Sequence, residues 1–175
     1  MIFPELQTNR LILRAIQPDD YARLRFLFSD FDVARMTASF PHPITDDWAR
    51  GFVTRNHSND LNKDVVWAID NGTGFIGSIG AHEIGETASL GYALGKYYWG
   101  RGYMTEAVQA VVNYLKTERC VDNVEACVFF GESCVISRSF EERVHTNHCL
   151  RSLLCLQRNG RSRSSGIQVG FSAVR

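Results

Sequence analysis

The sequence lacks long apolar segments. No run of it approaches the roughly 20 residues that a transmembrane helix requires. The N-terminus also lacks the succession of basic, apolar and small residues that marks a signal peptide. These two absences argue against a helical membrane protein and a secreted one, and they predict a cytoplasmic protein that does not bind a membrane.

Paired cysteine motifs are also missing. The five cysteines are an odd number, and no two of them form a C-x-x-C pair, so a disulfide framework is not indicated. His145, His148, Cys149 and Cys155 offer four possible zinc ligands, but the adjacent His148 and Cys149 suit tetrahedral coordination poorly. We therefore expect no metal site.

The chain has no excess of either charge. Its formal net charge is zero, which gives no electrostatic reason to expect nucleic-acid binding. The zero hides an asymmetry, because residues 131–175 contain seven Arg, three Glu and no Lys, whereas the first 130 residues are acidic. With 175 residues and 45% hydrophobic content, we expect a single domain over residues 1–175 with an atypical segment from 131 to 175.

One stretch, residues 90–107, combines a strand, a glycine-rich loop and the start of a long helix. From Gly102 onward, apolar residues recur at helical spacing, and polar residues occupy the other face. The apolar positions are Met104, Ala107, Val108, Val111, Val112 and Leu115. The pattern predicts an amphipathic helix that begins at the glycines.

The start of this helix suits an anion. The first N–H groups of a helix lack internal partners, and the helix dipole adds partial positive charge there. Gly100 and Gly102 have no Cβ atom, so a phosphate can approach the main chain closely, and the Thr105 hydroxyl adds a donor. Two glycines alone would equally suit a loop that only turns the chain into a core helix.

Three known types of phosphate-binding loop have glycines that lead into a helix, as this stretch does. A P-loop needs Lys followed by Ser or Thr after the glycines, and neither pair is present. A dinucleotide loop needs a third glycine where Thr105 stands, although Asp122 lies at a plausible distance for a ribose ligand. The third is the pyrophosphate loop of acyl-CoA transferases. Residues 99–107, preceded by Gly91-Tyr92-Ala93-Leu94, resemble the acetyl-CoA motif of the GNAT superfamily of N-acetyltransferases, most closely its RimJ/RimL-like branch; Tyr97 replaces the motif's usual Gln or Arg.

The resemblance implies how acetyl-CoA would be held. Its pyrophosphate would lie on the glycine loop, and its pantetheine arm would pair like an added strand in a gap between residues 92–94 and 124–130. A backbone N–H near Leu94 would face the thioester carbonyl oxygen. The implied cofactor-binding residues are Tyr92, Ala93, Leu94, Gly100, Arg101, Gly102, Tyr103, Met104 and Thr105.

The rest of the pattern predicts an α/β fold. Strands are predicted at residues 8–15, 65–69, 75–84, 88–94, 124–130, 144–156 and 167–173, and helices at 18–29, from a Thr45 cap through Val53, and from Gly102. The turn at residues 70–74 favours an antiparallel meander, and the long helix predicts parallel pairing of the strands on either side of it. Together with the resemblance, this predicts a mixed, mostly antiparallel central sheet flanked by helices.

Acetyl transfer also needs a base, an acid and an acceptor site. Glu83 and His82 are the strong proton acceptors before the motif, and Glu83 is the predicted base, although an ordinary surface role fits it as well. The family's Asn, Tyr and Gly-Phe after the last core strand are absent. Ser133 is the candidate near the leaving thiolate, with Cys134 and Ser137 as alternatives, although Ser and Cys are weaker acids than the missing Tyr. By resemblance the acceptor side would include Phe31, Met36, Phe40 and His42, which loop packing would explain equally well.

Two functions follow from these observations. The first is an acetyl-CoA-dependent N-acetyltransferase that modifies a primary amine, either a protein N-terminus or a small molecule. The alternative is a CoA-binding protein with weak or no catalysis, because the C-terminal catalytic segment is altered. For either function we expect a monomer or a homodimer.

Overall fold

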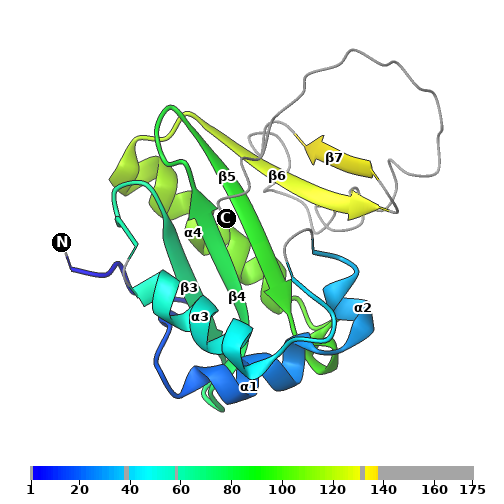
Figure 1. The fold of residues 1–175 in the computed structure, drawn as a ribbon. Coiled ribbons are helices and arrows are strands. Elements are labelled where there is room, and N and C mark those ends of the chain that lie inside the picture. Colours follow the sequence, from blue (N-terminus) through cyan, green and yellow to red (C-terminus); the bar gives the residue numbers. More distant parts are fainter. Residues whose placement is uncertain (1, 38–39, 58, 131–132, 138–175) are drawn as a thin grey trace.

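The strands join one sheet in the order in which they occur along the chain, in a computed structural model that describes residues 2–37, 40–57, 59–130 and 133–137 (Figure 1). The strands are β1 Leu6–Gln7, β2 Ile12–Ala15, β3 Val65–Asp70, β4 Phe75–His82, β5 Thr87–Leu94, β6 Asn123–Phe130 and β7 Ser133–Ser137. The helices are α1 Asp20–Phe28, α2 Phe31–Ala34, α3 Asp46–His57, the 3₁₀ turn η1 Lys96–Tyr98 and α4 Tyr103–Arg119.

The pairing directions confirm the predicted fold class. Neighbouring strands are antiparallel except β5 and β6, which are parallel and joined by α4. The meander β3–β4–β5 and the start of the long helix lie where the pattern predicts them. The predicted helix cap and the predicted turn are both present. The Thr45 hydroxyl accepts from Trp48 N–H at the start of α3. The Asp70 carboxylate accepts from two N–H groups of the turn after β3.

The predicted first strand at residues 8–15 is wrong in its first half. Thr8 N–H donates to the Leu11 carbonyl at 2.9 Å, so residues 8–11 form a turn that joins β1 to β2. The Thr8 hydroxyl also accepts from Leu11 N–H at 2.9 Å. A threonine that satisfies these backbone groups makes a turn competitive with a strand, although alternation continues across it.

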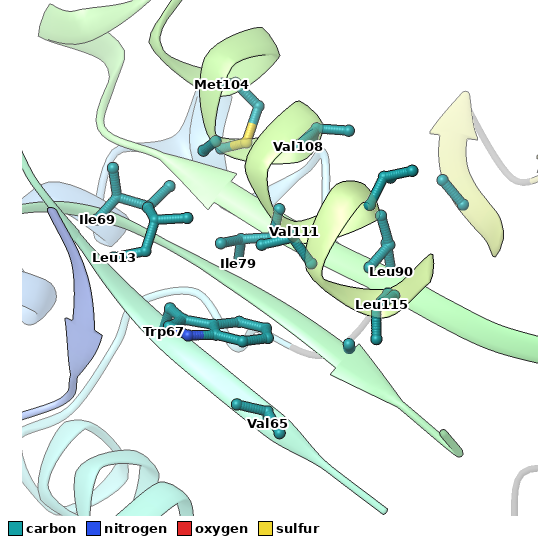
Figure 2. Packing of buried hydrophobic residues seen from close by; sticks show 14 of the residues in the cluster. Leu13, Val65, Trp67, Ile69, Ile79, Leu90, Met104, Val108, Val111 and Leu115 are labelled. Atoms are coloured by element: carbon teal, nitrogen blue, oxygen red, sulfur yellow. The ribbon is translucent and has the colours of Figure 1, made fainter. Parts of the chain in front are cut away.

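The sheet carries a separate apolar core on each face. Helix α4 packs on one face, where its buried residues meet Leu13, Trp67, Ile79 and other strand side chains (Figure 2). Helices α1 and α3 pack on the other face, over Val66, Ala68 and Ala93. The alternation of a strand divides its side chains between the two cores. Thus Leu90 and Leu94 of β5 point toward α4, and Ala93 points toward α1 and α3.

The remaining predictions differ from the structure at α2 or concern residues that the structure does not describe. The short helix α2 has no counterpart among the predicted elements. The predicted strands at 144–156 and 167–173 lie outside the described residues, as do the four zinc-type side chains. Within the described ranges no helix is long and apolar enough to cross a membrane, and no cluster of His, Cys, Asp and Glu is arranged to hold a metal.

Candidate active site

The glycine loop connects the end of β5 to the start of α4. Gly100 and Gly102 have φ angles of 72° and 77°, a left-handed conformation that glycine adopts without the cost of a Cβ atom. Glu106 N–H donates the first helical bond, to the Gly102 carbonyl at 3.1 Å. The three preceding N–H groups, of Tyr103, Met104 and Thr105, therefore lie at the positions that an α-helix leaves open to an anion.

The loop is fastened to the sheet at its beginning. Gly95 N–H donates to the Ile76 carbonyl of β4, and a Cβ atom at Gly95 would lie 2.9 Å from Leu27 Cδ2. The Trp99 indole N–H donates to the Leu94 carbonyl at 2.7 Å. Lys96 Nζ lies 2.7 Å from Asp32 Oδ2 of α2, and the bond from Lys96 lowers the pKa of the Asp32 carboxyl. The path from strand to helix is thus fixed by hydrogen bonds and packing.

Glu106, in the first turn of α4, ties the glycine loop to the β1–β2 turn. Its carboxylate accepts from the Thr8 hydroxyl at 2.6 Å and from the backbone and side chain of Arg10. Arg10 Nη1 also donates to the Arg101 carbonyl at 3.0 Å, and its guanidinium lies over the Tyr103 ring. Burial acts to raise the pKa of Glu106, but the bonds from Thr8 and Arg10 outweigh it and hold that pKa below its usual value.

The strands that precede and follow α4 separate along their length. The described β5–β6 ladder runs from Thr87 and Asn123 to Leu90 and Ala126, whereas β5 continues to Leu94 and β6 to Phe130. Figure 1 shows the two strands diverging beyond the paired half. Since Gly95 N–H points toward β4, strand alternation turns the N–H of Leu94 to the other side, toward this opening, while the Leu94 carbonyl accepts from Trp99. The opening leads from the middle of the sheet to the glycine loop.

The predicted cofactor residues form one continuous path. Tyr92, Ala93 and Leu94 lie in the half of β5 beyond the β5–β6 ladder, and residues 100–105 follow them at the end of the opening. Met104 and Ala93 have buried side chains, so these two residues can offer only main-chain groups to a ligand. Arg101 is exposed on the loop.

The two predicted catalytic residues lie apart along the sheet. Glu83 directly follows the last residue of β4, is exposed, and has a positive φ of 54°. Ser133 begins β7 and pairs with Phe130, on the edge of β6 opposite to β5. The structure does not bring these two residues together.

The predicted acceptor wall divides into exposed and packed side chains. Phe31 and Met36 are exposed, whereas Phe40 stacks on Phe28 and contacts Trp48 edge to face. The Phe31 and His42 rings meet edge to face, with their centroids 5.3 Å apart. Phe40 is thus a packing residue, and the two exposed side chains remain available to a ligand.

Sequence reasoning missed the residues that support this site from a distance. Thr8 and Arg10 contact Glu106 across 98 and 96 positions of the chain, and Asp64 contacts His82 across 18. No local pattern signals these partners. The strand register would have been needed to place Asp64 beside His82.

Comparison with known proteins agrees with the geometry. The family model described as "Acetyltransferase (GNAT) domain" matches residues 10–131. The N-acetyltransferase p20 of Bacillus licheniformis is 30% identical over 132 residues, covering 70% of this chain and 72% of p20. A GNAT-family acetyltransferase structure from Bacillus anthracis has a TM-score of 0.63 at 24% identity, covering 71% of this chain and 73% of that one.

A second solved structure shares the fold at lower identity. RimL, described as a ribosomal L7/L12 α-N-protein acetyltransferase in complex with coenzyme A, has a TM-score of 0.62 at 15% identity, covering 74% of this chain and 77% of its own. The family match spans the glycine loop, the helix behind it and the strands that diverge beside it. The chain therefore belongs to the GNAT family of N-acetyltransferases, enzymes that use acetyl-CoA as the acetyl donor.

Proposed function

We propose that this protein transfers the acetyl group of acetyl-CoA to a primary amine, with a protein N-terminal α-amine as its preferred acceptor. The observation that carries the proposal is the opening between β5 and β6, which ends at a glycine loop and a helix N-terminus. An extended thiol arm with a pyrophosphate at its end matches a strand-lined opening with an anion site at its end.

The cofactor's orientation follows from these two parts. The pyrophosphate would accept from the N–H groups of residues 103–105, with Gly100 and Gly102 allowing close approach. The arm would then run along β5 from Leu94 toward Gly91. A backbone N–H of β5 at the far end of this arm would face the thioester carbonyl oxygen, where negative charge develops during attack.

The proposed acceptor follows from the pKa values of the two kinds of amine and from the similarity of this fold to that of RimL. In an unstructured peptide the α-amine has a pKa of about 7.7–8.0 and the lysine side chain one of about 10.4, so the α-amine needs less help to lose its proton. The name of RimL states that it acetylates an α-amine of a ribosomal protein, and its fold is similar to that of this chain. Both observations favour an α-amine over a lysine side chain.

A second candidate, CoA binding with little transfer, is favoured by the chain after β6. The family resemblance leads us to expect an Asn, a Ser and then a helix that carries a Tyr there, whereas the next described element after β6 is the strand β7. A serine at position 133 is a weak acid for a leaving thiolate. Slow turnover with intact CoA binding is the behaviour expected of this candidate.

One experiment separates the two. Calorimetry measures CoA binding, and a thiol-release assay follows transfer to matched peptides with free or blocked N-termini. The proposed function requires CoA binding and thiol release that depends on the free α-amine. Binding without release for any primary amine would establish the second candidate. A cytoplasmic location and a monomeric or homodimeric state stay predictions.

A further inference from the structure

A row of polar side chains crosses the α1/α3 face of the sheet where β5 and β6 separate. His82 of β4 pairs with Ser89 of β5, and Ser89 pairs with Glu125 of β6. Val65 pairs with Ala81, so the residue before Val65, Asp64, lies beside His82. Paired residues of neighbouring strands point to the same face. The row therefore lies just before Leu90 and Ala126, the last paired residues ahead of the opening.

Within this row, Asp64 fixes the tautomer of His82. His82 Nδ1 lies 3.1 Å from Asp64 Oδ1, and the same oxygen accepts from Glu83 N–H at 3.4 Å. An ionised carboxylate can only accept, so the hydrogen bond requires the proton on Nδ1. Nε2 of the neutral ring then carries the lone pair. Among the described residues none hydrogen-bonds to Nε2.

Two glycines hold the imidazole ring against the backbone. Gly80 and Gly91 lie opposite each other in the β4–β5 ladder, two residues closer to the opening than His82 and Ser89 and on the same face. A Cβ atom on Gly80 would lie 2.6 Å from His82 Nε2, and one on Gly91 would lie 3.8 Å from it. The ring therefore extends over both glycines toward the half of β5 that lies beyond the β5–β6 ladder. Its side chain is 44% exposed, so a ligand can reach it.

We infer that His82 is the general base of the acetyl transfer and that Asp64 is its positioning residue; this inference rests on the proposed function. Gly91 is the first residue of β5 beyond the β6 ladder, and the donor arm would run along β5 toward it. Nε2 takes a proton from the attacking amine, directly or through one water. The N–C bond forms as the C–S bond breaks, and the proton passes through solvent to the leaving thiolate, which restores the neutral imidazole.

The charged groups around the ring favour this step. Asp64 directly precedes β3, and Glu83 directly follows β4. Strand β6 contributes Glu125, and β5 contributes the neutral Ser89. Among the described residues of this row the charged groups are all negative, so they attract an acceptor amine in its ammonium form. Glu83, the base predicted from sequence, lies outside the strand, whereas His82 has a fixed ring orientation.

The test compares His82→Gln, Asp64→Asn and Glu83→Gln in the full chain. The pH dependence of kcat/KM is measured with two peptide acceptors whose α-amine pKa values differ, and CoA affinity is measured by calorimetry. A limb of the pH profile whose apparent pKa is the same for both acceptors reports the titration of a group of the enzyme. His57→Gln, on the exposed end of α3, is the matched histidine control.

His82→Gln is expected to lower kcat/KM by about a hundredfold and to remove the acceptor-independent limb, with CoA affinity unchanged. Asp64→Asn is expected to lower kcat/KM at least about tenfold, because its amide no longer enforces the Nδ1–H tautomer. An active wild type whose limb survives in His82→Gln, or is lost only in Glu83→Gln, overturns the assignment while the proposed function stands. A wild type that binds acetyl-CoA and acetylates no primary amine overturns both.

Discussion

Single glycines decide the shape of this site because their positions leave no room for, or penalise, a side chain. Gly102 has a left-handed φ of 77° directly before α4, where the proposed phosphate site lies. A β-branched residue is disfavoured in that conformation and would also shield the helix N-terminus. Gly102→Val is therefore expected to weaken CoA binding at least about tenfold, as calorimetry would measure.

Gly72→Val provides the matched control. Gly72 has a φ of 87° in the β3–β4 turn, and a Cβ there would meet nothing within 4 Å. The substitution imposes a similar strain, about 1–2 kcal/mol, in a turn that supplies no N–H group to the proposed phosphate site. It should lower the thermal midpoint but leave CoA affinity unchanged. Equal loss of affinity in both variants would show that the effect is general destabilisation.

Gly80 is required by the ring that covers it. A methyl group on this residue would lie 2.6 Å from His82 Nε2 and 3.1 Å from Val66 Cγ2, so the imidazole must move. Gly80→Ala is expected to lower kcat/KM roughly tenfold or more, because small displacements of a reacting group are costly. CoA affinity should be unchanged.

Gly85→Ala is the control for that prediction. Its added methyl group would lie 3.8 Å from the Glu83 carbonyl, which is an ordinary contact. The rate should stay near that of the native protein. A Gly80→Ala variant that is as active as Gly85→Ala would mean that the ring position is unimportant for transfer.

At the scale of elements, the β1–β2 turn is joined to α4 by a carboxylate. Glu106 accepts from Thr8 and Arg10, and Arg10 also donates to the Arg101 carbonyl of the loop. The pKa of Glu106 is lowered from its usual value of 4.5, so the folded state favours the ionised form. The stability it contributes is present above about pH 4.5 and is lost as the pH falls through the lower pKa of the folded state.

Glu106→Gln is expected to lower the free energy of unfolding at pH 7 by about 1 kcal/mol, a modest value because Arg10 is half exposed. The difference from the native protein should shrink as the pH falls below about 4. Denaturant unfolding at several pH values measures it. A difference that is the same at pH 3 and pH 7 would contradict the proposed role of the ionised carboxylate.

The sequence predicted the elements whose pattern is local. The stripe on α4, the turn after β3 and the Thr45 cap depend on residues within one or two turns, and all three are confirmed. The boundary of β2 was wrong because Thr8 uses its hydroxyl to close a turn within an alternating pattern. Helix α2, of four residues, is too short to show a period.

At the scale of the whole molecule, the site is assembled by strand register and by contacts across long stretches of chain. The glycine motif indicated where acetyl-CoA would be held, since that chemistry depends on adjacent residues. The pairing of Asp64 with His82 depends on which residues of β3 and β4 are opposite, which a single sequence does not specify. The same is true of the β5–β6 opening.

The preferred acceptor can be tested with two peptides of the same sequence. One has a free N-terminus and an acetylated lysine, and the other has a blocked N-terminus and a free lysine. Because at least about half of an α-amine is deprotonated near pH 8 and less than about 1% of a lysine is, the first peptide should be acetylated at least about tenfold faster at that pH. Equal rates, measured by mass spectrometry of the products, would contradict the proposed α-amine preference.

Acetyl transfer itself is tested most directly by one measurement, thiol release from acetyl-CoA with a peptide that carries a free N-terminal α-amine. The opening between β5 and β6, the glycine loop and the His82–Asp64 pair together predict release that equals the amount of Nα-acetylated peptide. Blocking the N-terminus should abolish it. Tight binding of acetyl-CoA without thiol release for any primary amine would contradict the proposed transfer.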